Sequence, residues 1–168
     1  MISKINILVV LVIITVGIEA QIISKRDDGP PLSLKIEAID GVTYSSKILP
    51  INVVFRNTKD ESIRLLDVFR DSKMKLSFFT VKITDANETP INTVGGGKIS
   101  LSKDAMKYIT LKREESYLVP LDLVDFLPTD VRLQPGSYSV SVTYQNQYGE
   151  DCFKGKVESN TIILTIIE

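Results

Sequence analysis

The clearest alternation of apolar and polar side chains in this chain follows the dipeptide Pro135-Gly136. Beyond it, Tyr138, Val140, Val142 and Tyr144 are separated by single serine or threonine residues. Alternation of aromatic and β-branched residues with period two, directly after a turn dipeptide, is typical of a half-buried β-strand. We therefore predict a strand over residues 138–144, with the four large side chains on its buried face.

Shorter alternating stretches recur along the chain and are separated by turn residues. Those that we predict as strands are Leu32–Ala38, Ile51–Phe55, Ile63–Leu66, Leu76–Thr84, Met106–Leu111, Tyr117–Leu121 and Val157–Ile167. The charged segment Asp67 to Met74 predicts a loop, and a brief helical turn is expected at Leu123 to Leu127. The pattern as a whole predicts an all-β fold, a single antiparallel β-sandwich of about seven to nine strands.

The N-terminal segment follows a different pattern. Lys4 precedes an apolar run from Ile5, which ends in Ile18-Glu19-Ala20. This layout is typical of a secretory signal peptide, residues 1–20, that is cleaved after Ala20. Because Ile18 is bulkier than the small residue usual at that position, an uncleaved anchor helix reaching to about residue 23 is the alternative. Residues 21–31 end in Gly-Pro-Pro and predict a linker, and residues 32–168 the folded domain.

Charge and composition exclude several classes of function. The 168 residues include 20 Lys and Arg against 21 Asp and Glu, so the formal charge is −1 and no nucleic-acid surface is indicated. Histidine is absent, which removes the commonest general base and a common metal ligand. We therefore expect a chain that is not an enzyme and has no catalytic residues, no cofactor and no metal site. Contact with a membrane is expected only through an uncleaved N-terminal segment.

The segment Leu133-x-Pro-Gly-x-Tyr138 carries a resemblance to known proteins. With Phe55-Arg56-Asn57, Ser62–Leu66 and Ile109-Thr110-Leu111, it resembles the immunoglobulin-like domains of extracytoplasmic proteins. It is more loosely similar to the bacterial intracellular proteinase inhibitor-like domain. The resemblance implies an immunoglobulin-like sandwich, in which Tyr138 forms a tyrosine corner and its hydroxyl bonds to upstream backbone. The chain departs from antibody-type domains because it has a single cysteine and no tryptophan.

Two motifs suggest ligand chemistry, but their spacing does not support it. Gly95-Gly96-Gly97-Lys98 has Asn92 and Ile99 where a phosphate-binding loop needs glycine and Ser or Thr, so we interpret it as a flexible loop. Six carboxylates are candidate calcium ligands without the spacing of a calcium loop, and we interpret them as solvated loop residues: Asp67, Asp71, Asp122, Asp125, Glu150 and Asp151. Ser24-Lys25 and Ser102-Lys103 are adjacent in sequence, which says nothing about the geometry of a Ser-Lys dyad.

Two further positions are candidates for covalent modification. Cys152 is the only cysteine, so it has no internal disulfide partner and is a candidate for an intermolecular disulfide if the chain is exported. Two carboxylates immediately precede it and would raise the pKa of its thiol if they lie close. Asn87-Glu88-Thr89 is a candidate glycosylation site, although Pro90 disfavours its use.

We expect a non-catalytic, secreted or extracytoplasmic domain that binds a protein partner of unknown identity through its loops or an edge strand. The candidate contact residues are Asp67, Phe69, Arg70, Asp71, Gly95, Gly96, Gly97, Lys98, Tyr148, Glu150, Asp151 and Phe153. Two alternatives stay open. One is a proteinase inhibitor-like domain, and the other is a membrane-anchored subunit of a surface assembly, which retention of Met1 to Ile23 would favour.

Overall fold

The computed structural model describes residues 30–40, 44–70 and 72–167. The predicted signal peptide or anchor and most of the predicted linker lie outside these residues. Within the part of the chain that is described, no helix is long and apolar enough to cross a membrane.

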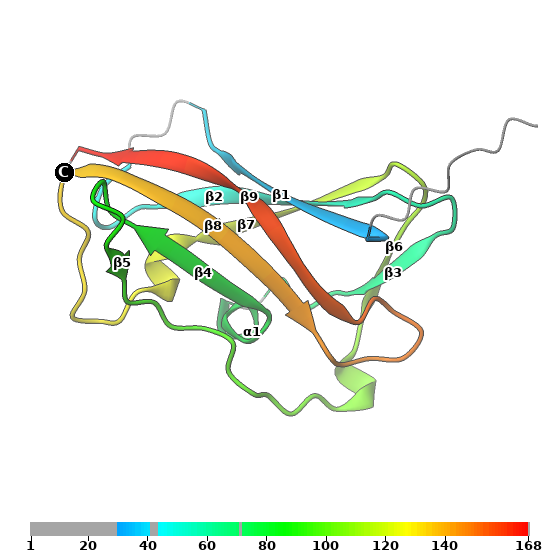
Figure 1. Cartoon of the computed structure of the whole chain (residues 1–168). Coiled ribbons are helices and arrows are strands. Elements are labelled where there is room, and N and C mark those ends of the chain that lie inside the picture. Colours follow the sequence, from blue (N-terminus) through cyan, green and yellow to red (C-terminus); the bar gives the residue numbers. More distant parts are fainter. Residues whose placement is uncertain (1–29, 41–43, 71, 168) are drawn as a thin grey trace, which may run out of the picture.

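The described residues form nine strands and three short helices (Figure 1). The strands are β1 (Leu32–Ala38), β2 (Pro50–Asn57), β3 (Ile63–Leu66), β4 (Phe79–Thr84), β5 (Pro90–Ile91), β6 (Tyr108–Leu111), β7 (Ser116–Asp122), β8 (Gly136–Asn146) and β9 (Gly155–Ile166). The helices are α1 (Ser72–Phe78) and the single-turn 3₁₀ helices η1 (Lys103–Ala105) and η2 (Leu123–Phe126).

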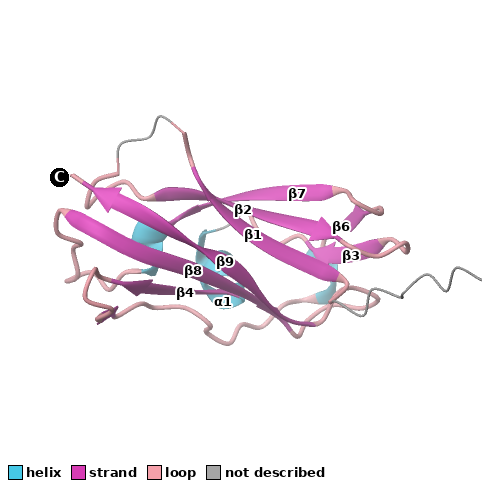
Figure 2. Cartoon of the chain, turned by 45° about the horizontal axis from the view of Figure 1, so that its top comes forward, coloured by secondary structure: helices cyan, strands magenta, loops and turns pink. Residues whose placement is uncertain are grey.

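The strands form antiparallel sheets in the orders β1-β2-β7, β3-β6 and β5-β4-β8-β9. This confirms the predicted all-β fold with antiparallel sheets (Figure 2). Strand β8 pairs with β4 on one side and with β9 on the other. The apolar C-terminal strand β9 is therefore paired along β8, as its composition requires.

The alternation along β8 produces the predicted buried face. Tyr138, Val140, Val142 and Tyr144 are all buried, whereas the serine and threonine side chains between them are half-buried. The hydroxyl of Tyr138 donates a hydrogen bond of 2.9 Å to the carbonyl of Gln134, four residues upstream. This contact fixes the turn that leads into β8.

An aromatic cluster joins the sheet that contains β8 to the sheet that contains β2. The rings of Tyr144 in β8 and Phe55 in β2 meet edge to face, with centroids 4.9 Å apart. Phe69 and Phe79 each contact both of these rings. Because burial of an aromatic side chain contributes about 1.5–3 kcal/mol, this cluster is a principal source of the stability of the fold.

Side-chain hydrogen bonds occupy backbone groups on both edge strands of the β1-β2-β7 sheet. Asn160 of β9 accepts from the backbone N–H of Ile36 in β1 at 2.8 Å and donates to its carbonyl at 3.1 Å. On the other edge, Lys75 of α1 donates to the carbonyl of Pro120 in β7 at 2.7 Å, and Pro120 has no N–H to offer. These contacts limit the pairing of either edge with another chain.

The predicted loop at Asp67 to Met74 is found at residues 67–70, and the strand predicted over Leu76 to Thr84 is found from Phe79 onward, but the prediction was wrong between them, because α1 covers Ser72–Phe78. Phe78 and Phe79 are consecutive and both buried, at 1% and 0% exposure. A strand would have placed them on opposite faces. A helical turn built from the good helix formers Met74, Lys75 and Leu76 lets both rings enter the same core.

The buried hydroxyl of Tyr144 has no hydrogen-bond partner among the described residues, so its removal tests how this group affects the stability of the core. Replacing it in the variant Tyr144→Phe should raise the free energy of unfolding by about 1 kcal/mol, because an unsatisfied buried polar group is removed. The matched variant Tyr138→Phe should lower it by about 1 kcal/mol, because the bond to Gln134 is lost. Urea denaturation of the three proteins measures both changes, and a loss of stability in Tyr144→Phe would contradict this description of the core.

The same tyrosine makes the stability depend on alkaline pH. Burial raises the pKa of Tyr144 far above its ordinary value of 10.0. The unfolded chain therefore loses this proton first, and the contribution to stability is complete below about pH 10 and is lost as the pH rises further. Between about pH 9 and about pH 11 the free energy of unfolding should fall more steeply in the native chain than in Tyr144→Phe. Urea denaturation at several pH values measures this difference. If both proteins lose stability in parallel, Tyr144 ionises equally well in the folded and the unfolded chain, which would contradict the raised pKa.

Candidate functional site

Three segments that are distant in sequence meet at one end of the molecule. They are residues 67–70 after β3, residues 99–108 before and in β6, and residues 147–153 between β8 and β9 (Figure 1). The backbone N–H of Asp67 donates to the carbonyl of Lys107 at 2.7 Å, and the N–H of Glu150 donates to the hydroxyl of Tyr108 at 3.1 Å. Residues 99–108 therefore lie between the other two segments and connect them.

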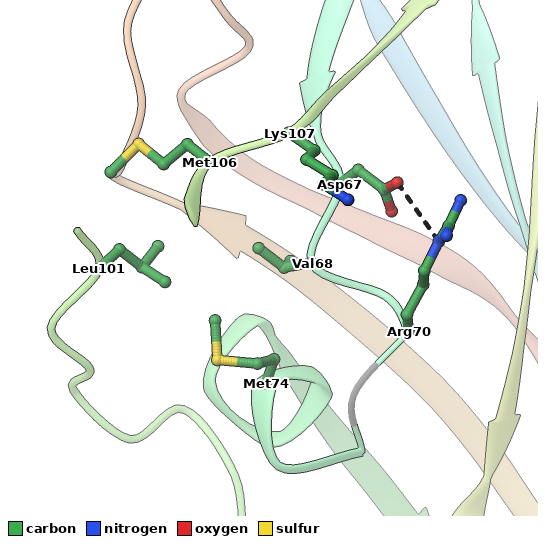
Figure 3. A pocket seen from close by; sticks show the side chains of 7 residues that line it. All are labelled: Asp67, Val68, Arg70, Met74, Leu101, Met106 and Lys107. Carbon is green, nitrogen blue, oxygen red and sulfur yellow. Dashed lines mark ion pairs between the residues drawn. The ribbon is translucent and has the colours of Figure 1, made fainter. Parts of the chain in front are cut away.

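A cavity of about 170 Å³ opens between the first two segments and helix α1 (Figure 3). Its apolar wall consists of Val68, Met74, Leu101 and Met106, and its charged residues are Asp67, Arg70 and Lys107. Met74, Leu101 and Met106 are each only half-buried, so these apolar side chains are partly exposed to solvent. We call these seven residues the methionine surface.

A second, wider hollow of about 400 Å³ adjoins the first through Met106. It is lined by Lys103, Met106, Tyr108, Gly149 and Glu150. Lys103 and Glu150 form an ion pair at 2.6 Å, and the guanidinium of Arg64 lies 4.3 Å from the ring centre of Tyr108. The hydrogen bond from Lys103 lowers the pKa of Glu150, and the same bond raises the pKa of Lys103. Lys103 is thereby held as a cation, which does not suit the base of a Ser-Lys dyad.

Asp67 is the most unusual charged residue of the methionine surface. Its side chain is only 9% exposed, and its Oδ1 atom has no hydrogen-bond partner among the described residues. The nearest cation is Arg70, whose Nε lies 3.8 Å from Oδ2, and the charge of Asp67 adds to the effect of burial in raising the pKa of Tyr117. Figure 3 shows the carboxylate directed toward Arg70 and away from Leu101 and Met106.

The buried side chain of Asn146 determines the shape of the loop between β8 and β9. Its Nδ2 donates to the carbonyls of Phe153 at 2.7 Å and Tyr148 at 3.2 Å, and its Oδ1 accepts from the N–H of Tyr148 at 2.9 Å. Gly149 adopts φ +86°, and a Cβ at this position would lie 2.7 Å from the sulfur of Cys152. The loop is thus held internally, so Glu150 and Asp151 project from a fixed backbone.

Cys152 is a half-buried free thiol in this loop. Burial is the main cause that raises the pKa of its thiol, and the neighbouring Asp151 contributes least. The pKa of the Cys152 thiol is therefore raised, as predicted, but the carboxylates before Cys152 are not the principal cause. The intermolecular disulfide stays a prediction.

The structure separates the predicted contact residues into different environments. Arg70, Glu150 and Asp151 are exposed, whereas Asp67 is buried at the side chain and Asp71 lies outside the described residues. Phe69 is 5% exposed and packs against Phe55, so it belongs to the core and offers no side chain to a partner.

Tyr148 and Phe153 also pack inward. Tyr148 contacts the ring of Phe78, and Phe153 contacts the ring of Tyr144, so each is half-buried against the aromatic cluster. They support the loop between β8 and β9 from within.

The glycine segment lies in irregular chain, as predicted for a loop, and the flexibility of this loop stays a prediction. It is bonded to two neighbouring elements, because Thr93 donates to the carbonyl of Val81 in β4 at 2.7 Å and Gly96 donates to the carbonyl of Leu76 in α1 at 2.6 Å. Gly95 adopts φ +151°, and a Cβ there would lie 2.7 Å from the carbonyl oxygen of Phe79. None of residues 95–98 lines either cavity.

The other candidate positions are distributed over the molecule. Asn87 is exposed in the turn after β4, where Asp85 accepts from the N–H groups of Asn87 and Thr89, and its glycosylation stays a prediction. Asp122 accepts from the N–H groups of Leu49 and Val124 and so caps η2. Across the described part of the chain, no group of three or more Cys, Asp or Glu residues is placed to hold a metal ion.

Sequence analysis missed the central residues of the site, Met74, Leu101, Met106, Lys107 and Tyr108. Met106 and Tyr108 were assigned to a strand, and no local motif distinguishes Leu101 or Met74. The chain matches no protein-family model, and no curated protein matches it.

Asn146 provides a test of how the loop is held. The variant Asn146→Asp keeps the acceptor for Tyr148 but removes both donated bonds and places a carboxylate beside two carbonyls. We expect the free energy of unfolding to fall by about 2 kcal/mol and amide hydrogen exchange at residues 148–153 to accelerate. The same substitution at exposed Asn87 is the control. Unchanged exchange in the loop would contradict its support by Asn146.

Proposed function

We propose that this chain is an exported, non-catalytic, immunoglobulin-like β-sandwich that binds a protein partner through the methionine surface. The observation that carries this proposal is the partly exposed apolar cavity formed by residues 67–70, α1 and residues 99–107. A pocket with an apolar wall and a charged rim can receive an apolar anchor side chain of a partner, as pockets in protein interfaces do.

Three features support the immunoglobulin-like sandwich. The sheets β1-β2-β7 and β5-β4-β8-β9 contribute side chains to one core cluster. Tyr138 bonds back to Gln134 at the start of β8, which is the contact of a tyrosine corner. The three-strand and four-strand sheets are of the size expected in such domains, and the two-strand sheet β3-β6 is additional to them.

The choice of residues supports docking at this surface. Met74 and Met106 are the only methionines of the chain apart from Met1, and both line the same cavity. Methionine is flexible and polarisable, and it adapts to the shape of a bound side chain. Loops are also favoured over an edge strand as the contact site, because Asn160 and Lys75 already occupy backbone groups of β1 and β7.

The proposals of export and of a non-catalytic role rest on the sequence. Export rests on the signal-peptide pattern of residues 1–20, and a membrane-anchored subunit of a surface assembly would require that segment to be retained. The non-catalytic role rests on the absence of histidine. A proteinase inhibitor is the second candidate, because the internally bonded loop between β8 and β9 projects Glu150 and Asp151 from a fixed backbone.

Site-specific photocrosslinking tests the proposed contact surface. The exposed residue Lys107 is replaced by benzoylphenylalanine in the cells that express the chain, and exposed Ile163 on β9 is replaced in the control. We expect a discrete protein adduct from position 107 and none from position 163. Adding Met106→Asp should reduce the adduct about tenfold, because a charge then enters the apolar cavity.

The identity and position of the adduct decide between the alternatives. A protease joined to position 107 would favour the inhibitor. An adduct formed only from position 163 would place the contact on the face of β9, and no adduct from either position would contradict binding of a protein partner.

A further inference from the structure

We propose that the cavity of the methionine surface accepts an aliphatic side chain of the partner that is directly followed or preceded by a carboxylate. This inference rests on the proposed function and adds the chemistry of the partner segment. It follows from the shape of the cavity and from which charges around it are exposed.

The cavity suits one aliphatic side chain. Val68, Met74, Leu101 and Met106 surround a volume of about 170 Å³ and supply no hydrogen-bonding side-chain groups other than weakly polar sulfur. A polar side chain would lose its hydration there without replacement. An aliphatic side chain gains about 1.5–3 kcal/mol from complete burial.

The exposed charges at the rim are positive. Arg70 is 84% exposed, and the one ion pair that it forms with a described residue is the long contact with Asp67 at 3.8 Å. Lys107 is exposed, and its side chain makes no ion pair with any residue that the structure describes. Figure 3 shows Lys107 and Arg70 on opposite sides of Asp67. Both cations are therefore available to a carboxylate that arrives beside the apolar side chain.

The negative groups nearby are less able to bind a partner cation. The carboxylate of Asp67 is buried, and its Oδ1 atom is inaccessible to solvent. Glu150 in the adjoining hollow is paired with Lys103 at 2.6 Å, and exposed Asp104 lines neither cavity. The surface that a partner meets is thus apolar at its centre and cationic at its rim, in a chain whose formal charge is −1.

The expected preference is modest because rim charges are solvated. Exposed ion pairs contribute about 0.2–1 kcal/mol each, so two cations should favour an acidic over a basic partner segment by about fivefold. The preference should weaken with added salt, because the interaction is screened.

Three short blocked peptides test the inference by NMR titration of the isotope-labelled protein as purified from its host. They are acetyl-Glu-Leu-Glu-amide, acetyl-Lys-Leu-Lys-amide and acetyl-Glu-Ser-Glu-amide. We expect the first to shift the amide signals of Val68, Leu101 and Met106 at about fivefold lower concentration than the second. The serine peptide should leave these signals unshifted, because it has no aliphatic side chain to bury.

The outcomes separate the chemistry of the partner from the docking surface itself. Equal or tighter binding of the lysine peptide at these residues would overturn the preference for a carboxylate but leave the docking surface standing. Shifts from the serine peptide alone would show simple ion binding at the rim and overturn the role of the cavity. If neither leucine peptide shifts these signals at millimolar concentration, both the inference and the methionine surface as docking site are rejected.

A charge-reversal variant checks the source of the preference. Lys107→Glu should remove the fivefold advantage of the acidic peptide without changing the fold, because this side chain is exposed. The control is Lys82→Glu on the outer face of β4, which should leave the preference intact. An unchanged preference in Lys107→Glu would assign the effect to another group and contradict the proposed role of this rim.

Discussion

Burial of the aromatic rings around Tyr144 is the interaction on which the rest of the structure depends. Rings from β2, β4, β8 and the segment before α1 contact one another, so the two larger sheets are joined through side chains that are remote in sequence. The chain has one cysteine and hence no internal disulfide to help. Packing therefore has to hold the sheets together, and it does so even though the hydroxyl of Tyr144 has no hydrogen-bond partner among the residues that the structure describes.

Two buried asparagine side chains hold irregular segments of the chain in a defined conformation. Asn57 accepts from the N–H of Lys59 and donates to the carbonyls of Glu61 and Leu111, which fixes the turn after β2 against β6. Asn146 does the same for the loop between β8 and β9. Both are buried because they supply the hydrogen bonds that the local backbone lacks. The loop between β8 and β9, which adjoins the candidate site through the hydrogen bond of Glu150 to Tyr108, thus has its shape fixed by hydrogen bonds, whereas the turn after β2 lies at the other end of the β3-β6 ladder.

The candidate site combines a hydrogen-bonded backbone with adaptable side chains. The backbone around it is held by hydrogen bonds, whereas its wall consists of half-exposed Met74, Leu101 and Met106. A fixed frame with a deformable lining is suited to recognising a short segment of another protein. The edge strands β1 and β7 are less suited, because Asn160 bonds to the backbone of β1 and Lys75 to that of β7. The loops are therefore favoured over these edges as the contact surface.

The sequence by itself determined the all-β character, the buried face of β8 and the approximate positions of most strands, because alternation along a strand is a local property that burial on one face imposes. It did not reveal α1. Phe78 and Phe79 are consecutive in the chain, and both side chains reach the core only because a helix ends at Phe78 and a strand begins at Phe79. The cavity could not be predicted from the sequence either, because its apolar wall comes from segments that meet only after folding: Val68, Met74, Leu101 and Met106. Contacts of that kind depend on the packing of distant elements, and only the tertiary structure decided them.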